Sequence, residues 1–474
     1  MPAAKSGNHI YVTGSGNTLA SITTDINDAA FIEKTGTSPD IYTLKGNVAR
    51  YLYVRPGGEL TIGDPEDYSM NETLAFDQSV TQLNRLYVNQ GGHLKQYGNT
   101  VIDFVTHPTN RAYYSYIYGA MTIQGDDTYK PIWQNYRRIY FYENQNNDTY
   151  KNDIWNFDKM IFAGADAANE YAIYFQGMGK VRAHNFTNIT WDKTAGGRGN
   201  QMYPLYVPYG INGFENIVFN NLNFVDVGSY PIYMNNAGSQ EYSNCIFGTG
   251  TSWKTYILGT YRNDPTQRYY SYDYLSPEVF GQDFVYIHDS VYDSTGTAGV
   301  VFVSQGGTLL LKDVEFQHTA GDSIQVQYQG TVMLWTGVTF TGGREVYDLD
   351  YAGCVNRVFA LDLTVQDKFG NPIEDAKVGI TQKDGKESFL FRTNASGKLI
   401  NHFNINKALL TNIHQYGNNK ATNIEKWSDT SNGTYHIVNI FKLGYRPKTL
   451  NIVMDEDKSQ TVVLRDLNSF RVEN

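Results

Sequence analysis

An all-β solenoid of short, stacked strands is the fold that the sequence of this 474-residue chain predicts. One phrase recurs through the first two-thirds: an apolar alternation, then Gly-Gly or Gly-x, then a second apolar alternation. Its copies are centred on Gly57-Gly58, Gly91-Gly92, Gly119, Gly306-Gly307 and Gly330. The abundance of Gly (44) and Tyr (38) against Pro (13) favours short strands, tight turns and aromatic faces. Strand, turn and strand repeated at tens of residues are typical of a solenoid.

The spacing of the repeats predicts the size of one coil. The first two glycine pairs begin at Gly57 and Gly91, and a second phrase places Asn188, Asn216 and Asn244 at even intervals. One coil of three strands and three turns needs roughly 20 to 30 residues, which is close to both spacings. The repeats therefore predict a right-handed, single-stranded parallel β-helix. The three asparagines form either a hydrogen-bonded ladder or ordinary turns.

The chain divides into three predicted parts. Residues 1–40 hold an opening strand and a capping helix, expected over 21–34, where apolar residues recur at nearly helical spacing. A cap is expected because an open first coil would expose strand edges and apolar core. Residues 41–358 form the β-helix, with candidate insertions at 129–150 and 256–284.

The sequence pattern changes at residue 359. A Gly-Asn-Pro turn at 370–372, a Thr-x-x-x-Gly step at 393–397 and a closing Gly-Tyr-Arg-Pro at 444–447 follow one another between apolar alternations. In this order they resemble the carboxypeptidase regulatory-like, transthyretin-like β-sandwich, from Leu361 to Leu464. The resemblance implies a small sandwich over 359–474 that acts as a non-catalytic cap, adhesion or spacer module.

Composition excludes several classes of protein. The net charge of −10 comes without any basic run, which argues against a nucleic-acid surface. No apolar run approaches 18 residues, and the first residues lack the apolar core of a signal peptide, so we expect no membrane span and either cytoplasmic synthesis or a removed leader. Cys245 and Cys354 are too few for a disulfide framework or a zinc site and are expected to be buried thiols.

Acidic residues supply weak catalytic candidates. A glycoside hydrolase needs two or three carboxylates facing one groove, and a lyase needs a calcium site with a base. The densest acidic set in the coils is Asp153, Asp158, Asp166 and Glu170. Their spacings of 5, 8 and 4 do not match one position on successive coils, so they are either catalytic or solvated turn residues. His288 stands alone in the sequence, and no metal or cofactor is predicted.

The tyrosines allow two interpretations. Tyr51, Tyr87 and Tyr116 are expected to stack inside the solenoid as core ladders. A second group alternates with charged residues and is expected to bind glycan, with rings stacking on sugars and charges bonding hydroxyls. This glycan-binding group is Tyr261, Arg262, Arg268, Tyr269, Tyr270, Tyr272 and Tyr274.

The whole chain, a solenoid followed by an accessory sandwich without disulfides or secretion signal, resembles a bacteriophage virion protein of the tail-fibre, tailspike or capsid-decoration type. The resemblance implies a non-enzymatic attachment protein with a rigid surface, located on a virion or outside the cell. It also implies a homo-oligomer, commonly a trimer, that contacts other virion proteins and a host surface polysaccharide.

Two other functions remain open at this point. Pectate-lyase-like β-helices include polysaccharide lyases and glycoside hydrolases, so the chain is alternatively a depolymerase. A third hypothesis is that the chain is a secreted adhesin or surface-layer component whose leader was trimmed. The fold alone does not distinguish the three functions, because one fold supports many functions.

Overall fold

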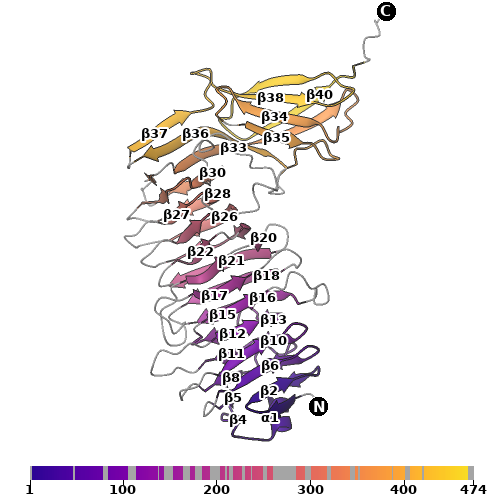
Figure 1. The fold of residues 1–474 in the computed structure, drawn as a ribbon, viewed down its shortest axis with the longest axis vertical. Helices are drawn as coiled ribbons and strands as arrows, with labels where there is room; N and C mark the ends of the chain where they lie inside the picture. Colours follow the sequence, from indigo (N-terminus) through magenta and orange to yellow (C-terminus); the bar gives the residue numbers. More distant parts are fainter. Residues whose placement is uncertain are drawn as a thin grey trace, which may run out of the picture.

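A computed structural model gives the structure of the chain. It describes residues 3–45, 49–77, 84–104, 114–136, 138–142, 153–163, 171–176, 184–192, 203–208, 211–212, 217–226, 230–235, 238–248, 254–259, 284–293, 300–317, 322–341, 347–350, 353–386, 388–400, 406–418 and 421–467. Within these residues the fold is all-β with parallel sheets, and α1 (Leu19–Ile26) is the single helix. The strands stack into a long column, and a C-terminal unit crosses its far end (Figure 1).

Two long sheets form the column. The first consists of β1 (Ala3–Ser6), β2 (His9–Val12), β6 (Tyr51–Val54), β9 (Arg85–Val88), β12 (Tyr114–Ile117), β15 (Arg138–Tyr142), β17 (Tyr171–Gln176), β19 (Tyr203–Pro208), β22 (Ile232–Asn235), β25 (Thr255–Leu258), β27 (Val301–Ser304), β29 (Ile324–Val326) and β32 (Tyr347–Leu349). Each strand from β2 onward pairs in parallel with the next strand of this series.

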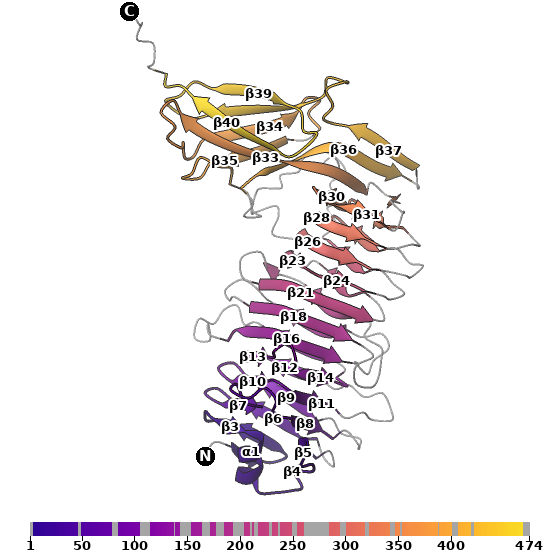
Figure 2. The same cartoon turned by 180° about the vertical axis from the view of Figure 1, so that it is seen from behind.

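The second sheet has two legs in most coils. Its strands along the column are β3 (Asn17–Thr18), β4 (Ile32–Lys34), β5 (Asp40–Leu44), β7 (Glu59–Ile62), β8 (Glu72–Phe76), β10 (His93–Tyr97), β11 (Thr100–Asp103), β13 (Ala120–Gln124), β14 (Ile132–Gln134), β16 (Trp155–Ala163), β18 (His184–Asp192), β20 (Ile211–Asn212), β21 (Ile217–Asp226), β23 (Gly238–Ser243), β24 (Ile246–Phe247), β26 (Phe284–Tyr292), β28 (Thr308–Phe316), β30 (Thr331–Leu334) and β31 (Thr339–Phe340). One coil therefore passes through the first sheet and then both legs of the second, as Figure 2 shows from behind.

Left-handed residues bend the second sheet between its legs. Asn188, Asn221 and Asn244 occupy this bend in three consecutive coils, with φ of 56°, 54° and 54°. The hydrogen-bonded ladder joins Asn188 to Asn221 rather than to Asn216, because Phe186 pairs with Phe219. Asn244 occupies the same bend, but its side chain donates to Asn220 at 2.7 Å, so the predicted ladder of Asn188, Asn216 and Asn244 is only partly right. Asn216 lies outside the described residues.

The glycine pairs are explained by two separate needs. Gly57 and Gly91 have φ of 73° and 74°, a left-handed conformation that glycine adopts without cost. The second glycine of each pair packs against the preceding coil, since a Cβ on Gly58 would lie 2.2 Å from the carbonyl oxygen of Val12. The recurring phrase therefore marks a tight turn followed by close contact between coils.

The interior contains stacked aromatic and aliphatic side chains. In the later coils Phe224, Phe247, Tyr292, Phe316 and Phe340 form one inner series with ring centroids 4.5 to 5.5 Å apart. Burying a large apolar side chain contributes about 2 to 3 kcal/mol, so this core stabilises the stack strongly.

The prediction that Tyr51, Tyr87 and Tyr116 lie inside the solenoid is wrong. Their neighbours Leu52 and Ile117 fill the interior, with exposures of 1% and 0%, while the three tyrosines alternate onto the outer face. Alternation reveals two faces of a strand but not which is inside. Phenol hydroxyls need water or a polar partner, so tyrosine takes the outer position when an aliphatic residue competes with it.

Helix α1 covers the first coil and is shorter than the predicted 21–34. Thr18 caps its start in a capping box with Ser21, and Asn27, with φ of 43°, ends it. The following residues form β4 instead of more helix. Leu19 and Ile22 of this helix are fully buried. The expected cap is therefore present in a shorter form.

The C-terminal unit has a buried core to which Leu310 and Met333 of the column also contribute, and it shares a strand with the column. It contains β33 (Cys354–Asp367), β36 (Ala408–Asn418), β37 (Ala421–Lys426) and β40 (Lys458–Leu464), and a four-stranded sheet of β35 (Ser388–Arg392), β34 (Lys377–Gln382), β38 (His436–Phe441) and β39 (Lys448–Ile452). β33 begins by pairing in parallel with β30 and ends by pairing with β40. The predicted boundary at 358–359 falls within this strand.

Asp457 joins the column to the C-terminal unit. Its carboxylate accepts hydrogen bonds from the Trp335 indole at 3.0 Å, from the Thr336 hydroxyl at 3.0 Å and from the Ala360 amide at 2.7 Å. Charged acceptors of this kind stabilise by about 1.5 to 3 kcal/mol each, so the contact fixes the joint.

Both cysteines and the helix content agree with the sequence. Cys245 and Cys354 are both buried, and burial raises the pKa of Cys245 to about 12. In the part of the chain that the structure describes, no helix is long and apolar enough to span a membrane.

Candidate functional site

The structure separates the acidic candidates that it describes. The Asp153 carboxylate is buried and lies 2.9 and 3.2 Å from the Gly91 amide, which donates to it. Asp158 accepts a hydrogen bond from the Asn188 side chain at 2.7 Å. Asp153 therefore links two coils that are separated by a third, and Asp158 links adjacent coils. Asp166 and Glu170 lie outside the described residues.

The predicted glycan-binding segment is also outside the described residues. This applies to Tyr261, Arg262, Arg268, Tyr269, Tyr270, Tyr272 and Tyr274. The described aromatic surface lies elsewhere, on the outer face of the first sheet.

A tyrosine column follows the outer face of the first sheet, one residue per coil. It consists of Tyr11, Tyr53, Tyr87, Tyr116, Tyr140 and Tyr174. The same register position continues through the backbone of β19 to Tyr233, Tyr256 and Phe302 in later coils. From Tyr11 to Tyr140 the ring centroids lie 4.8 to 5.2 Å apart, with interplanar angles of 6° to 22°. The rings therefore form one continuous stack.

Stacking determines which parts of the rings meet solvent. Because each ring face is covered by the next ring, ring edges and phenol hydroxyls are the parts left for contact. Ring edges carry partial positive charge, and phenols donate hydrogen bonds. Burial raises the pKa of Tyr53 and of Tyr116 above its ordinary value, so both stay protonated at physiological pH. The column thus presents donors and positive edges.

A parallel arginine column lies two residues earlier in the same strands. It consists of His9, Tyr51, Arg85, Tyr114 and Arg138. The Arg85 guanidinium lies 5.5 Å from the centre of the Tyr51 ring and 5.9 Å from that of Tyr114. Its Nη1 also donates to the Tyr87 hydroxyl at 3.3 Å, and Arg138 donates to Tyr140 at 2.6 Å. Aromatic rings therefore hold both guanidiniums in place by cation–π contacts.

Two guanidiniums on this face have no neutralising carboxylate among the described residues. The sequences of β2 through β29 in the first sheet contain no Asp or Glu. No carboxylate of the described segments lies within ion-pair distance of Arg55 or Arg85, although the chain carries a net charge of −10. Arg55 lies over the first ring of the tyrosine column, 4.3 Å from the centre of Tyr11. The face combines cations, hydrogen-bond donors and flat aromatic edges.

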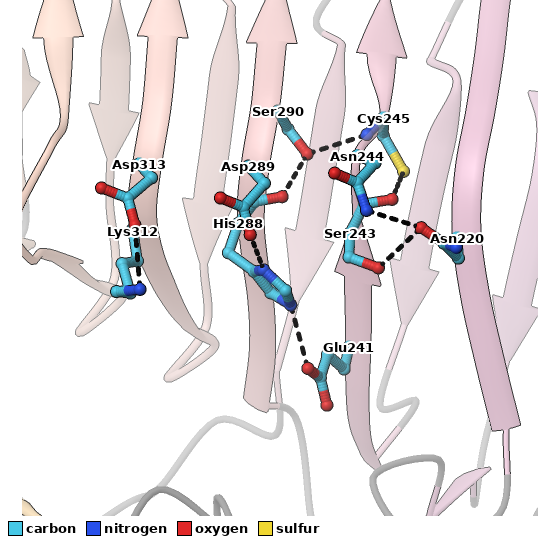
Figure 3. A network of polar contacts seen from close by, with 10 residues as sticks. All are labelled: Asn220, Glu241, Ser243, Asn244, Cys245, His288, Asp289, Ser290, Lys312 and Asp313. Carbon is cyan, nitrogen blue, oxygen red and sulfur yellow. Dashed lines mark hydrogen bonds and ion pairs between the residues drawn. The ribbon is translucent and has the colours of Figure 1, made fainter.

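A polar network on the second sheet is a separate site (Figure 3). His288 of β26 contacts Glu241 of β23 through Nε2 at 2.9 Å and Asp289 through Nδ1 at 2.6 Å. Burial alone would lower the pKa of His288, but the hydrogen bonds and charges of both carboxylates raise it above its ordinary value. The Tyr286 ring stacks on the imidazole at 4.7 Å, and Lys312 lies in the next coil.

Sequence reasoning missed this network. Glu241 and His288 are far apart in the chain, and only the parallel pairing of β23 with β26 brings them together. The strand register that joins them has no local sequence motif. Both imidazole nitrogens are engaged by carboxylates, so the ring needs one partner to move before it could transfer a proton to a ligand.

In the described segments, no group of three or more His, Cys, Asp or Glu side chains is placed to hold a metal ion. No known family model, curated protein or solved structure matches this chain.

Proposed function

We propose that this chain is a non-enzymatic attachment protein that presents a rigid surface to a cell-surface glycan. In this proposal residues 41–358 form a right-handed parallel β-helix, 1–40 its cap and 359–474 a transthyretin-like sandwich. The location on a bacteriophage virion, as tail fibre, tailspike or capsid decoration, follows from the resemblance of the whole build, and so does a trimeric state.

The tyrosine column carries the proposal. It places a polar, aromatic surface at the same register on successive coils, and the coils are locked by a continuous core. A preorganised surface loses little side-chain freedom on binding, which favours affinity for an extended ligand. The two described acidic candidates, Asp153 and Asp158, are instead engaged in contacts between coils.

Binding to intact cells and to a glycan panel tests this function. The purified chain should bind cells that carry the cognate envelope glycan and lose binding when that glycan is stripped enzymatically. Bound glycan should be recovered at its original length. Failure to bind any envelope or glycan would overturn the proposal.

A polysaccharide depolymerase is the second candidate, and the His288 network favours it. An imidazole held between Glu241 and Asp289 on the outer face of a parallel sheet has the groups needed for general acid–base chemistry. Incubation with host glycans, followed by assays for new reducing ends and unsaturated sugars, separates the two functions. Sustained turnover that is lost in His288→Gln would establish the enzyme.

The third hypothesis is a secreted adhesin or surface-layer component. It shares the binding surface of the first proposal and differs in location. Immunogold labelling of purified virions and of producing cells distinguishes them, since an adhesin labels the cell envelope in the absence of phage.

A further inference from the structure

We propose that the free end of the C-terminal unit docks onto an anionic lipid bilayer by inserting three exposed apolar side chains among the headgroups. This tip consists of Phe369, Leu443 and Leu467 with the turns that carry them. It lies in a different part of the molecule from the tyrosine column. Lipid binding therefore goes beyond the proposed attachment to glycan and does not depend on it.

The three apolar side chains of the tip are exposed to solvent. Phe369 is 76% exposed, Leu443 84% and Leu467 52%. They follow the ends of β33, β38 and β40 respectively. β33 and β40 run in parallel and end together, since Asp367 pairs with Leu464. Single exposed apolar residues are ordinary, but several of them gathered at one place mark an interaction surface.

Polar contacts connect the turns of the tip. The Leu467 amide donates to the carbonyl oxygen of Gly444, in the turn that carries Leu443, at 2.9 Å. The neighbouring Asp466 carboxylate pairs with Lys368, in the turn that carries Phe369, at 3.6 Å. The apolar side chains are therefore presented by one connected framework, which loses little backbone freedom on binding.

Positive charge exceeds negative charge at the tip, although the whole chain has a net charge of −10. The segments that form the tip are 367–377, 441–448 and 464–467, and they contain four Asp or Glu residues against six cations. The cations are Lys368, Lys377, Lys442, Arg446, Lys448 and Arg465.

Three of these cations are exposed and available to an anionic surface. They are Lys377, Lys448 and Arg465. No carboxylate of the described residues lies within ion-pair distance of them, because Asp466 pairs with Lys368, and Asp375 with Arg392 and Lys442. Anionic headgroups attract cations that lie near the bilayer surface. Cations beside large apolar side chains are typical of segments that lie in a membrane interface.

A protein partner fits the tip less well than a lipid surface. The core of protein–protein interfaces is depleted in lysine, whereas Lys368 lies 4.9 Å from the centre of the Phe369 ring. The apolar side chains also extend from turns at an end of the unit that projects beyond the column (Figure 1, Figure 2), and not from a flat sheet face. Such an end can enter the headgroup region of a bilayer, which is reached at a depth of about 5 to 10 Å.

The test measures binding of the full chain to two kinds of lipid vesicle. Vesicles of mixed phosphatidylcholine and phosphatidylglycerol are compared with vesicles of phosphatidylcholine alone, by flotation and by co-sedimentation. The variants are Phe369→Ser, Leu443→Ser and, as a matched control, Ile424→Ser. Ile424 is 64% exposed on β37, at the other end of the C-terminal unit (Figure 1). Circular dichroism and thermal melting establish that each variant is folded.

We expect the wild type to bind the anionic vesicles and to bind the neutral ones about tenfold more weakly or worse. Phe369→Ser and Leu443→Ser should each weaken binding to the anionic vesicles about tenfold, because each removes a large apolar side chain from the lipid contact. Ile424→Ser should bind like the wild type. Raising the salt concentration should weaken binding, since it screens the attraction between cations and headgroups.

Four outcomes would overturn the proposal. Equal binding to both kinds of vesicle would remove the preference for anionic lipid. An equal loss in Ile424→Ser would place the contact elsewhere. Concentration-dependent self-association that is lost in Leu443→Ser would make the tip a contact between copies. Absence of vesicle binding in a protein that still binds isolated glycan would sink the lipid contact alone and leave the proposed attachment function intact.

Discussion

The tyrosine column and the asparagine ladder repeat once per coil, yet they use their hydrogen bonds differently. In the ladder, the Asn221 side-chain amide donates to the Asn188 carbonyl oxygen at 2.6 Å, and Asn188 donates to Asp158 at 2.7 Å. An amide carries both donor and acceptor, so the ladder satisfies itself. Guanidiniums carry donors only, and Arg55 and Arg85 have no carboxylate acceptor among the described residues. Both repeated features support the fold. Only the face with more hydrogen-bond donors than acceptors keeps groups that can bind a ligand.

Replacing Asn188 should give the largest loss of stability of the changes considered. Asn188→Ala places a Cβ residue without a compensating side chain at φ of 56° and removes two ladder bonds, so we expect a loss of about 3 kcal/mol in the free energy of unfolding. Denaturant unfolding measures it. Asn188→Gly is the control: it tolerates the backbone and loses only the two ladder bonds, about 2 kcal/mol in all. Equal losses in both variants would refute a role for the left-handed bend.

A substitution in the tyrosine column should lower the free energy of unfolding by less than the change at Asn188. Tyr116→Ala removes stacking against Tyr87 at 5.0 Å and Tyr140 at 5.1 Å, and we expect a loss of about 2 kcal/mol in unfolding free energy. Tyr116→Phe keeps both contacts and should stay within about 0.5 kcal/mol of the wild type. If the phenylalanine variant were as unstable as the alanine variant, the hydroxyl and not the stack would support this coil.

Arg85→Gln sharpens the contrast between stability and binding. The guanidinium contributes cation–π contacts on a partly exposed face, so its loss should lower the free energy of unfolding by about 1 kcal/mol at most. Differential scanning fluorimetry beside the binding assay makes the comparison. A large destabilisation would show that the arginine column serves the fold, as the asparagine ladder does.

The smallest expected effect is the pH dependence of the His288 network. The pKa of His288 is raised in the folded protein, so the stabilisation is complete below the unfolded pKa of about 6.5 and is lost as pH rises through the folded value. The difference in unfolding free energy between wild type and His288→Gln should shrink by about 0.5 kcal/mol between pH 6 and pH 9, a small figure because the ring is partly exposed. If the difference in unfolding free energy between the two proteins grew with pH, His288 would not be stabilised in its protonated form.

The recurring glycine phrase predicted the stacking of strands well, because its two requirements are local. A left-handed turn at Gly57 and close contact at Gly58 both exclude side chains, whatever surrounds them. The first two glycine pairs occupy equivalent places, since Val54 pairs with Val88 immediately before them. Such a feature can be read from one sequence.

The candidate sites could not be predicted in the same way. In the segment Tyr51-Leu52-Tyr53-Val54 both alternating sets are apolar, so the sequence does not say which set faces the core. The packing of the opposing sheet decides it. The His288 network depends on a register between strands separated by an insertion, and the length of that insertion hides the pairing.

The asparagine ladder shows how a near repeat misleads. Phe214 and Phe219 both precede sequences that fit the phrase, and an even interval between repeats favours the first. The structure pairs Phe219 with Phe186, so the interval from Asn188 to Asn221 is longer than the interval from Asn221 to Asn244. Coils of unequal length are stacked in register, and the extra residues lie between the paired strands β18 and β21.

The continuous strand β33 has a mechanical consequence. A flexible linker between two units lets one move independently of the other, whereas β33 carries the backbone from the last coil straight into the C-terminal unit (Figure 1). The first half of β33 is hydrogen-bonded to β30 and β36, and its second half to β40. A pull along this strand loads many backbone hydrogen bonds in shear at once, and Asp457 braces the corner. Tension or torque applied at one end of the molecule is therefore transmitted to the other end through the hydrogen bonds of β33 and Asp457.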